Sequence, residues 1–278
     1  MPKSENKKEM YITKASRETE AYNQKKFCSS LRNSGVPRNI IQKVCGEVER
    51  DIFPGITTKE LSDKTFGYLL KENPNFAARY SLKNAIMELG PSGFAFEQYI
   101  SKVLKNYGYK TKTNQIIRGK CVSHEVDVIA EKEKEKFFIE AKYHNSRGIK
   151  SDVKVAMYTY ARILDIRESM GKSSDGWLIT NTKFTSNAKK YGKCIGLKMT
   201  GWKYPKGESL EKMIEEKELY PITILPSVNQ LEKERFIENG IFLARDVLKF
   251  QISDFKKMGI NYTVGMKIFN EVKHLYGG

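Results

Sequence analysis

Apolar residues recur every three or four positions over most of the first 90 residues, which is the spacing of amphipathic helices. After a short strand over 10–14, this spacing predicts helices over 23–34, 37–51, from Thr57 or Thr58 onward, and 75–89. The segment Gly-Pro-Ser-Gly at 90–93 then interrupts the pattern. We therefore predict a helical N-terminal domain over residues 10–90.

The order of predicted elements changes after Gly93. A helix over 94–107 is followed by strand-like runs over 109–117, 124–130 and 136–143, a helix capped at Ser151, and then strand, helix and strand between 177 and 199. Six alternating charges, from Glu131 to Lys136, favour a solvated hairpin loop between the second and third strands. The order αβββαβαβ predicts an α/β domain over residues 91–226, followed by a helical C-terminal extension over 227–278.

The charge of the chain points to a polyanionic partner. Lys and Arg total 49 against 33 Asp and Glu, a formal net charge of +16, and such an excess favours binding to nucleic acid. No run approaches the roughly 18 apolar residues of a membrane span, and the charged N-terminus lacks the apolar stretch of a signal peptide. We expect a cytoplasmic protein without a membrane partner; the sequence leaves open whether it forms a homo-oligomer.

The four cysteines predict neither a zinc site nor a disulfide framework. They are scattered along the chain without any CxxC pair. We expect four buried thiols at Cys28, Cys45, Cys121 and Cys194.

Two of the predicted strands carry charged residues at mid-strand. Side chains alternate between the faces of a strand, so Glu140 and Lys142 share one face, and Asp127 lies on one face of the preceding strand. If the two strands form an antiparallel hairpin, Asp127, Glu140 and Lys142 lie side by side. Charges in mid-strand are costly unless a partner or a metal ion compensates them.

This arrangement fits the hydrolysis of phosphodiester bonds. Paired carboxylates are hard ligands suited to Mg²⁺ or Mn²⁺, which lowers the pKa of a bound water and neutralises a phosphate. Lys142 could orient that water or stabilise the charge that develops in the transition state. The same residues also fit a solvated ion pair on a hairpin, and the pattern alone does not distinguish the two interpretations.

Residues 93–202 resemble the Mrr-type branch of the PD-(D/E)XK restriction endonucleases. The resemblance lies in the segments FAFEQYISKVLKNYGY, HEVDVIA, FFIEAKY and WLITNTKFTSNAKKYGKCIGL, in that order. It implies a restriction-endonuclease-like αβββαβ core, with Asp127 and Glu140 as metal ligands and Lys142 as the catalytic lysine. Glu97 corresponds to a helix glutamate that supports the metal site in this family; a surface position on an amphipathic helix is the alternative.

Other polar residues near the predicted strands have weaker functional interpretations. His124 lies an odd number of residues from Asp127, so we expect it on the opposite face in a structural role. His144 is a candidate phosphate contact. Gln115, Lys150 and Lys154 could approach DNA, although solvated polar groups are the simpler account.

The N-terminal segments YITKASRETEAYNQKKF, ITTKELSD and AARYSLKNAI resemble the ATP-cone, a regulatory module of ribonucleotide reductases and their repressors. The resemblance implies an ATP or dATP site, and lysines beside a helix N-terminus do favour phosphate. The residues that it implies for this site are Lys14, Glu20, Asn23, Lys26 and Thr58. Ala15 and Arg17 depart from the family pattern, and a scaffold without a ligand is the alternative.

The leading hypothesis is a Mg²⁺- or Mn²⁺-dependent DNA endonuclease with a nucleotide effector, acting in restriction or phage defence. The alternative is a non-catalytic, nucleotide-responsive DNA-binding regulator. The set of Asp127, Glu140 and Lys142 favours the enzyme, because DNA binding alone does not require acids that repel phosphate. The sequence does not distinguish DNA from RNA as the substrate.

Overall fold

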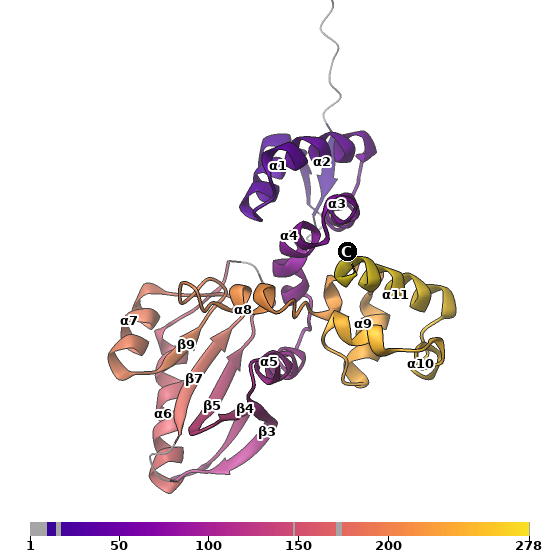
Figure 1. The fold of residues 1–278 in the computed structure, drawn as a ribbon. Coiled ribbons are helices and arrows are strands. Elements are labelled where there is room, and N and C mark those ends of the chain that lie inside the picture. Colours follow the sequence, from indigo (N-terminus) through magenta and orange to yellow (C-terminus); the bar gives the residue numbers. More distant parts are fainter. Residues whose placement is uncertain (1–9, 15–17, 147, 171–173, 278) are drawn as a thin grey trace, which may run out of the picture. The chain divides into compact units, whose positions relative to one another are not determined.

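The computed structural model describes residues 10–14, 18–146, 148–170 and 174–277 (Figure 1). The chain divides into two compact units, residues 1–81 with 269–278, and residues 82–268. The predicted domain limits at 90/91 and 226/227 stay predictions. Among the described helices, none combines the length and the apolar character that a membrane span needs.

The smaller unit joins a two-stranded hairpin to helices. Its elements are β1 (Tyr11–Thr13), β2 (Thr19–Ala21), α1 (Gln24–Asn33), α2 (Arg38–Asp51), α3 (Thr58–Glu72), the first part of α4 (Pro74–Met87) and the last part of α11 (Tyr262–Tyr276). Leu31, Val44 and Leu69 are fully buried in it. Helix α3 begins with a capping box in which the side chains of Thr57 and Glu60 each accept from the other's backbone N–H, so Thr57, and not Thr58, is the cap.

The cysteine prediction is wrong at all four positions. Cys28 of α1 and Cys45 of α2 form a disulfide, and Cys121 and Cys194 are exposed free thiols. The paired cysteines are 17 residues apart on neighbouring helices. Tertiary packing of the two helices brings them together, and their spacing along the chain carries no sign of it.

The larger unit has the predicted order of helices and strands, with two short strands, β6 and β8, that were not predicted. It contains the end of α4, α5 (Phe94–Asn106), β3 (Lys110–Arg118), β4 (Ser123–Lys132), β5 (Glu135–Lys142), β6 (Lys150–Ser151), α6 (Val153–Met170), β7 (Asp175–Thr180), β8 (Lys183–Phe184), α7 (Ser186–Ile195), β9 (Lys198–Thr200), α8 (Leu210–Glu216), the 3₁₀ turn η1 (Ile222–Ile224), α9 (Gln230–Glu238), the 3₁₀ helix η2 (Ala244–Lys249), α10 (Ile252–Lys257) and the start of α11. The αβββαβ core is therefore confirmed as a fold.

A five-stranded mixed sheet in the order β3-β4-β5-β7-β9 forms the centre of this unit (Figure 1). Strands β3, β4 and β5 are antiparallel neighbours, and β7 and β9 continue the sheet parallel to β5. The hydroxyl of Thr111 lies 2.7 Å from that of Ser101 on α5, whereas Phe138 packs against Ile163 of α6. Thr111 and Phe138 lie on opposite faces by strand alternation, so α5 and α6 cover opposite faces of the sheet.

Two local predictions need correction. Ser151 is the second residue of β6, and the side chain of Asp152 caps α6 by accepting from the backbone N–H groups of Lys154 and Val155. The charged hairpin is confirmed, but its strands pair as far as Lys132 and Glu135, which shortens the predicted loop to two residues.

Candidate active site

Asp127 of β4 and Glu140 of β5 lie close together at the point where the pairing of these two strands ends. The paired register runs to Val128 opposite Ile139, and the next position along each strand holds these two acids. The backbone N–H of Ala141 donates to Asp127 Oδ2 over 2.7 Å. The carboxylate of Asp127 thus accepts from a backbone N–H of β5 at the point where the pairing of β4 and β5 ends.

Lys142 lies on the same face of β5 as Glu140, two residues further along the strand. It lies beside Thr180 in the parallel register between β5 and β7 and is half-buried. Within the described residues it has no hydrogen bond or ion pair, although its charge acts on both Asp127 and Glu140. An ammonium group is therefore left available beside two carboxylates.

The two acids are held in an unfavourable environment for charge. Burial raises the pKa of Asp127. The hydrogen bond from the Ala141 N–H lowers this pKa, but it is the smaller effect. Burial, followed by the charge of Asp127, raises the pKa of Glu140. Desolvated acids that repel each other are a common feature of functional sites, because a bound cation can compensate them.

Glu97 approaches the same group of acids from α5. It lies in the first turn of the helix, and burial, followed by the charge of Asp127, raises its pKa. Asn114 of β3 donates from Nδ2 to Glu97 Oε2 over 3.1 Å and has a φ of +52°, in the left-handed region. The sequence contained no sign of this distortion, and Asn114 was not among the predicted site residues.

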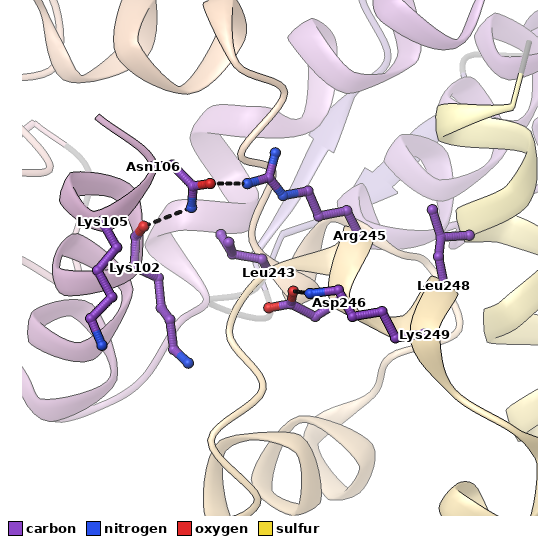
Figure 2. Close-up of a pocket in the computed structure, with 8 residues that line it drawn as sticks. All are labelled: Lys102, Lys105, Asn106, Leu243, Arg245, Asp246, Leu248 and Lys249. Carbon is purple, nitrogen blue, oxygen red and sulfur yellow. Dashed lines mark hydrogen bonds and ion pairs between the residues drawn. The ribbon is translucent and has the colours of Figure 1, made fainter. Parts of the chain in front are cut away.

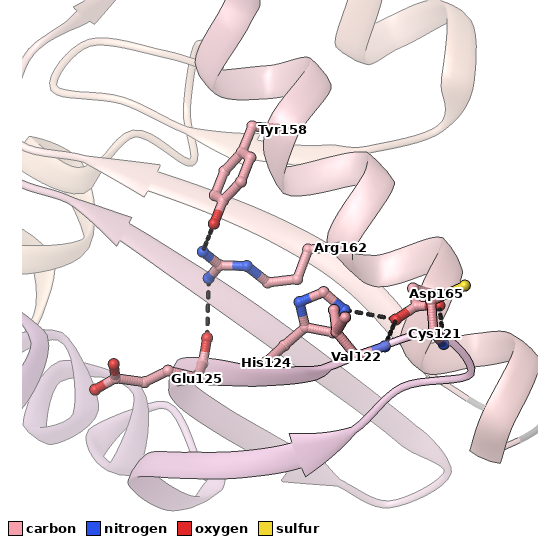
Figure 3. A network of polar contacts seen from close by, with 7 residues as sticks. All are labelled: Cys121, Val122, His124, Glu125, Tyr158, Arg162 and Asp165. Atoms are coloured by element: carbon pink, nitrogen blue, oxygen red, sulfur yellow. Dashed lines mark hydrogen bonds and ion pairs between the residues drawn. The ribbon is translucent and has the colours of Figure 1, made fainter.

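Arg162 of α6 is a second residue that the sequence analysis missed. Its Nη1 donates to Glu140 Oε2 over 2.6 Å and to the backbone carbonyl of Glu125 over 3.0 Å, and its Nη2 donates to the hydroxyl of Tyr158 over 2.9 Å. Figure 3 shows the guanidinium between Tyr158 and the Glu125 backbone, with the Glu125 side chain directed away from it. Arg162 thereby compensates part of the charge of Glu140 through an ion pair, and its charge also acts on Asp127.

Asp165 lies one turn further along α6 and holds the start of β4 (Figure 3). It accepts from His124 Nε2 over 2.7 Å and from the backbone N–H groups of Cys121 and Val122 over 2.8 and 3.3 Å. The Cys121 N–H and the His124 ring hold the pKa of Asp165 far below its usual range. His124 therefore has the structural role that was predicted.

The weaker candidates lie around the edge of the site. His144 is half-buried, with Nε2 2.8 Å from the hydroxyl of Ser151, and burial lowers its pKa. Gln115 donates from Nε2 to the backbone carbonyl of Thr113 over 2.8 Å, and its approach to DNA stays a prediction. Lys150 and Lys154 are exposed.

In the N-terminal unit the predicted nucleotide residues do lie close together. Glu20 binds both lysines, with 2.6 Å to Lys14 Nζ and 2.7 Å to Lys26 Nζ, and these partners lower its pKa to about 2. Asn23 caps α1 by accepting from the N–H of Lys26 over 2.9 Å. Thr58 is exposed at the start of α3, which a bridge between Thr13 and Thr57 joins to β1. Ala15 and Arg17 lie outside the described residues.

The donor set of the larger unit fits a hard divalent cation. Asp127 Oδ1 and Glu140 Oε1 take part in no hydrogen bond or ion pair with the described residues, so each acid has an oxygen left for a ligand. Over the described ranges, no group of three or more His, Cys, Asp and Glu side chains is arranged to hold a metal ion. Two carboxylates are nevertheless enough for Mg²⁺, which keeps several of its waters and takes substrate oxygens as further ligands.

The fold and the site together define a restriction-endonuclease-like domain. A family model described as restriction endonuclease matches residues 91–200, which indicates a nuclease. A second model, described as AF1548-like, C-terminal, matches residues 220–276.

The chain belongs to the AF1548-like family. An uncharacterized protein of Archaeoglobus fulgidus is 39% identical over 178 residues, which are 64% of this chain and 100% of that protein. The crystal structure of AF1548, a protein of unknown function, has 37% identity and a TM-score of 0.58 over 66% of this chain and 97% of its own. A repair endonuclease from Pyrococcus abyssi has 21% identity and a TM-score of 0.30 over 36% of this chain and 41% of its own, too low to support an argument.

Proposed function

We propose that this protein is a metal-dependent DNA endonuclease whose centre consists of Asp127, Glu140 and Lys142. One observation carries the proposal: two desolvated acids lie close together at the end of the β4–β5 ladder, beside a lysine without a partner among the described residues. Binding to DNA alone would not require such acids, because they repel phosphate.

Each residue has a distinct task in this proposal. Asp127 and Glu140 would hold Mg²⁺ or Mn²⁺, which supplies activation of water and neutralises charge on the scissile phosphate. Lys142 stabilises the negative charge that develops on the phosphate in the transition state, or orients the attacking water. Glu97 supports the site by accepting from Asn114, and it brings a further acid close to Asp127, Glu125 and Glu140.

Cleavage of plasmid and linear DNA tests the proposal. We expect supercoiled plasmid to be nicked or linearised in Mg²⁺ or Mn²⁺ and to stay intact in a chelator. Asp127→Ala serves as the control for a contaminating nuclease: it should lose metal affinity and cleavage while binding DNA at least as tightly, because a repulsive charge is removed. Parallel reactions with a duplex RNA of the same sequence test whether the protein cleaves DNA or RNA. If neither DNA nor RNA is cleaved with Mg²⁺ or with Mn²⁺, the alternative of a non-catalytic DNA-binding regulator is favoured.

The cluster of Lys14, Glu20 and Lys26 supports a second part of the proposal, that the N-terminal unit is ATP-cone-like and binds ATP or dATP. Two lysines share one acid at the start of α1, which leaves a positive charge next to the helix N-terminus. Titration calorimetry with millimolar nucleotide should detect binding that Lys26→Gln weakens and Glu20→Gln strengthens. No heat of binding in the parent protein would leave the unit as a scaffold.

A further inference from the structure

A basic cavity lies between α5 and η2 in the larger unit. Figure 2 shows three residues on the α5 side, Lys102, Lys105 and Asn106, and five on the other, Leu243, Arg245, Asp246, Leu248 and Lys249. The cavity measures about 510 Å³, within the range of about 300–1,000 Å³ that ligand sites usually have. None of these residues belongs to the proposed metal centre.

The charges that line this cavity are poorly compensated. Its basic residues are Lys102, Lys105, Arg245 and Lys249, and its one carboxylate, Asp246, pairs with Lys249 over 2.9 Å. Arg245 donates to neutral oxygens, the side-chain carbonyl of Asn106 and the backbone carbonyl of Lys217. Within the described residues, the ammonium groups of Lys102 and Lys105 have neither a hydrogen bond nor an ion pair. Such a concentration of positive charge attracts an anionic group.

The walls of the cavity add an apolar surface. Leu243 is buried at its base, and Leu248 is 41% exposed at its edge. A phosphate next to a sugar or base combines an anion with apolar surface, so the lining matches the chemistry of a nucleotide unit. An inorganic anion alone would form no apolar contact with the two leucines.

The position of the cavity along α5 identifies the source of that nucleotide unit. Glu97 lies near the acids of the proposed metal centre, and Lys102 and Lys105 follow on the same helix. A helix rises about 1.5 Å per residue, so the two lysines lie roughly 7 to 12 Å beyond Glu97 along its axis. Successive nucleotides of one DNA strand advance about 3.4 Å, and a strand at the metal centre would reach the cavity within about four nucleotides.

We propose that the cavity between α5 and η2 binds a nucleotide unit of the substrate DNA strand, a few nucleotides from the bond that is cleaved. This inference rests on the proposed function, because it takes DNA as the polyanion. It makes the C-terminal extension part of the substrate-binding surface.

Salt-dependent DNA binding tests the cavity directly. The double variant Lys102→Gln/Lys105→Gln is compared with Lys134→Gln/Lys206→Gln, which removes the same charge at two exposed lysines elsewhere. All measurements use the Lys142→Ala background in a chelator, so that cleavage does not interfere. The cavity variant should lose about tenfold in affinity at low salt, and its logarithmic salt slope should fall by about 2, since each phosphate contact contributes roughly 0.9; the control variant should change little.

Three results would overturn the assignment. Equal losses in both double variants would mean a general charge effect, and no loss in either would mean that DNA does not enter the cavity. Binding of millimolar dAMP that the cavity variant loses, without displacement of DNA from the parent, would mean that the cavity takes a free nucleotide and not the DNA strand. A protein that shows the expected binding pattern but never cleaves DNA would refute the proposed function and leave the cavity assignment intact.

Discussion

At the scale of single residues, the state of the Asp127 carboxyl determines how the site behaves. Burial raises its pKa, so the folded protein is more stable when this group is protonated, and that stability is lost as the pH rises through the raised pKa. The ionised Asp127 carboxylate therefore lowers the stability of the folded protein at neutral pH, and a bound cation would offset this loss.

The variant Asp127→Asn tests whether the ionised carboxylate lowers the stability of the folded protein. The amide keeps an oxygen that can accept from the Ala141 N–H, but it removes the buried charge and its repulsion of Glu140. In a chelator at pH 8 we expect the variant to unfold at a higher temperature than the parent, with the difference disappearing near the ordinary aspartate pKa of about 3.9. Glu133→Gln, an exposed acid in the β4–β5 turn, makes the same charge change and should have no such effect. A variant less stable than the parent at pH 8 would contradict this account.

At the scale of elements, helix α6 fixes β4 at two points. Arg162 binds the backbone of Glu125 and the side chain of Glu140, and Asp165 binds the turn that precedes β4. Arg162 and Asp165, which are one helical turn apart, thus both hold the strand that carries Asp127. A displacement here would change the separation of the two acids.

Asp165→Ala should lower the midpoint of thermal unfolding at pH 7, because it leaves two backbone N–H groups and His124 without an acceptor. The pKa of Asp165 is far below its usual range, so its stabilising effect is present at neutral pH and is lost as the pH falls. The difference from the parent should therefore shrink below about pH 4. Equal unfolding midpoints at pH 7 would show that this network does not hold the strand.

The elements themselves were largely predictable from the sequence, since strand alternation placed Asp127, Glu140 and Lys142 on one face. The structure brings Asp127 and Glu140 together at the end of the β4–β5 pairing, and Glu140 and Lys142 alternate onto one face of β5, whereas the chemical roles of these residues stay predictions. Arg162 could not be inferred, because its partner Glu140 is 22 residues away and depends on how α6 packs against the sheet. Asn114 was missed for a related reason: its contacts with Glu97 and Gln98 depend on how α5 packs against β3.

At the scale of the whole molecule, the excess of positive charge predicts how DNA binds. With a net charge of +16, most of the affinity should come from phosphate contacts and the release of counterions. If about six phosphates are contacted, raising the salt from 50 to 200 mM should weaken binding by roughly 10³-fold. Fluorescence anisotropy with a labelled duplex measures this dependence, and an affinity indifferent to salt would indicate a different partner.

The most direct test of the central claim is the rate of DNA cleavage by Lys142→Ala in a single turnover at saturating Mg²⁺ or Mn²⁺. An interaction made only in the transition state should slow the chemical step and leave DNA and metal binding nearly unchanged when it is removed. We expect a loss of about 10²-fold or more, by analogy with the removal of one oxyanion donor, while Lys134→Ala in the exposed turn cleaves like the parent. Cleavage by Lys142→Ala as fast as the parent would contradict the catalytic role of this lysine and favour the DNA-binding regulator.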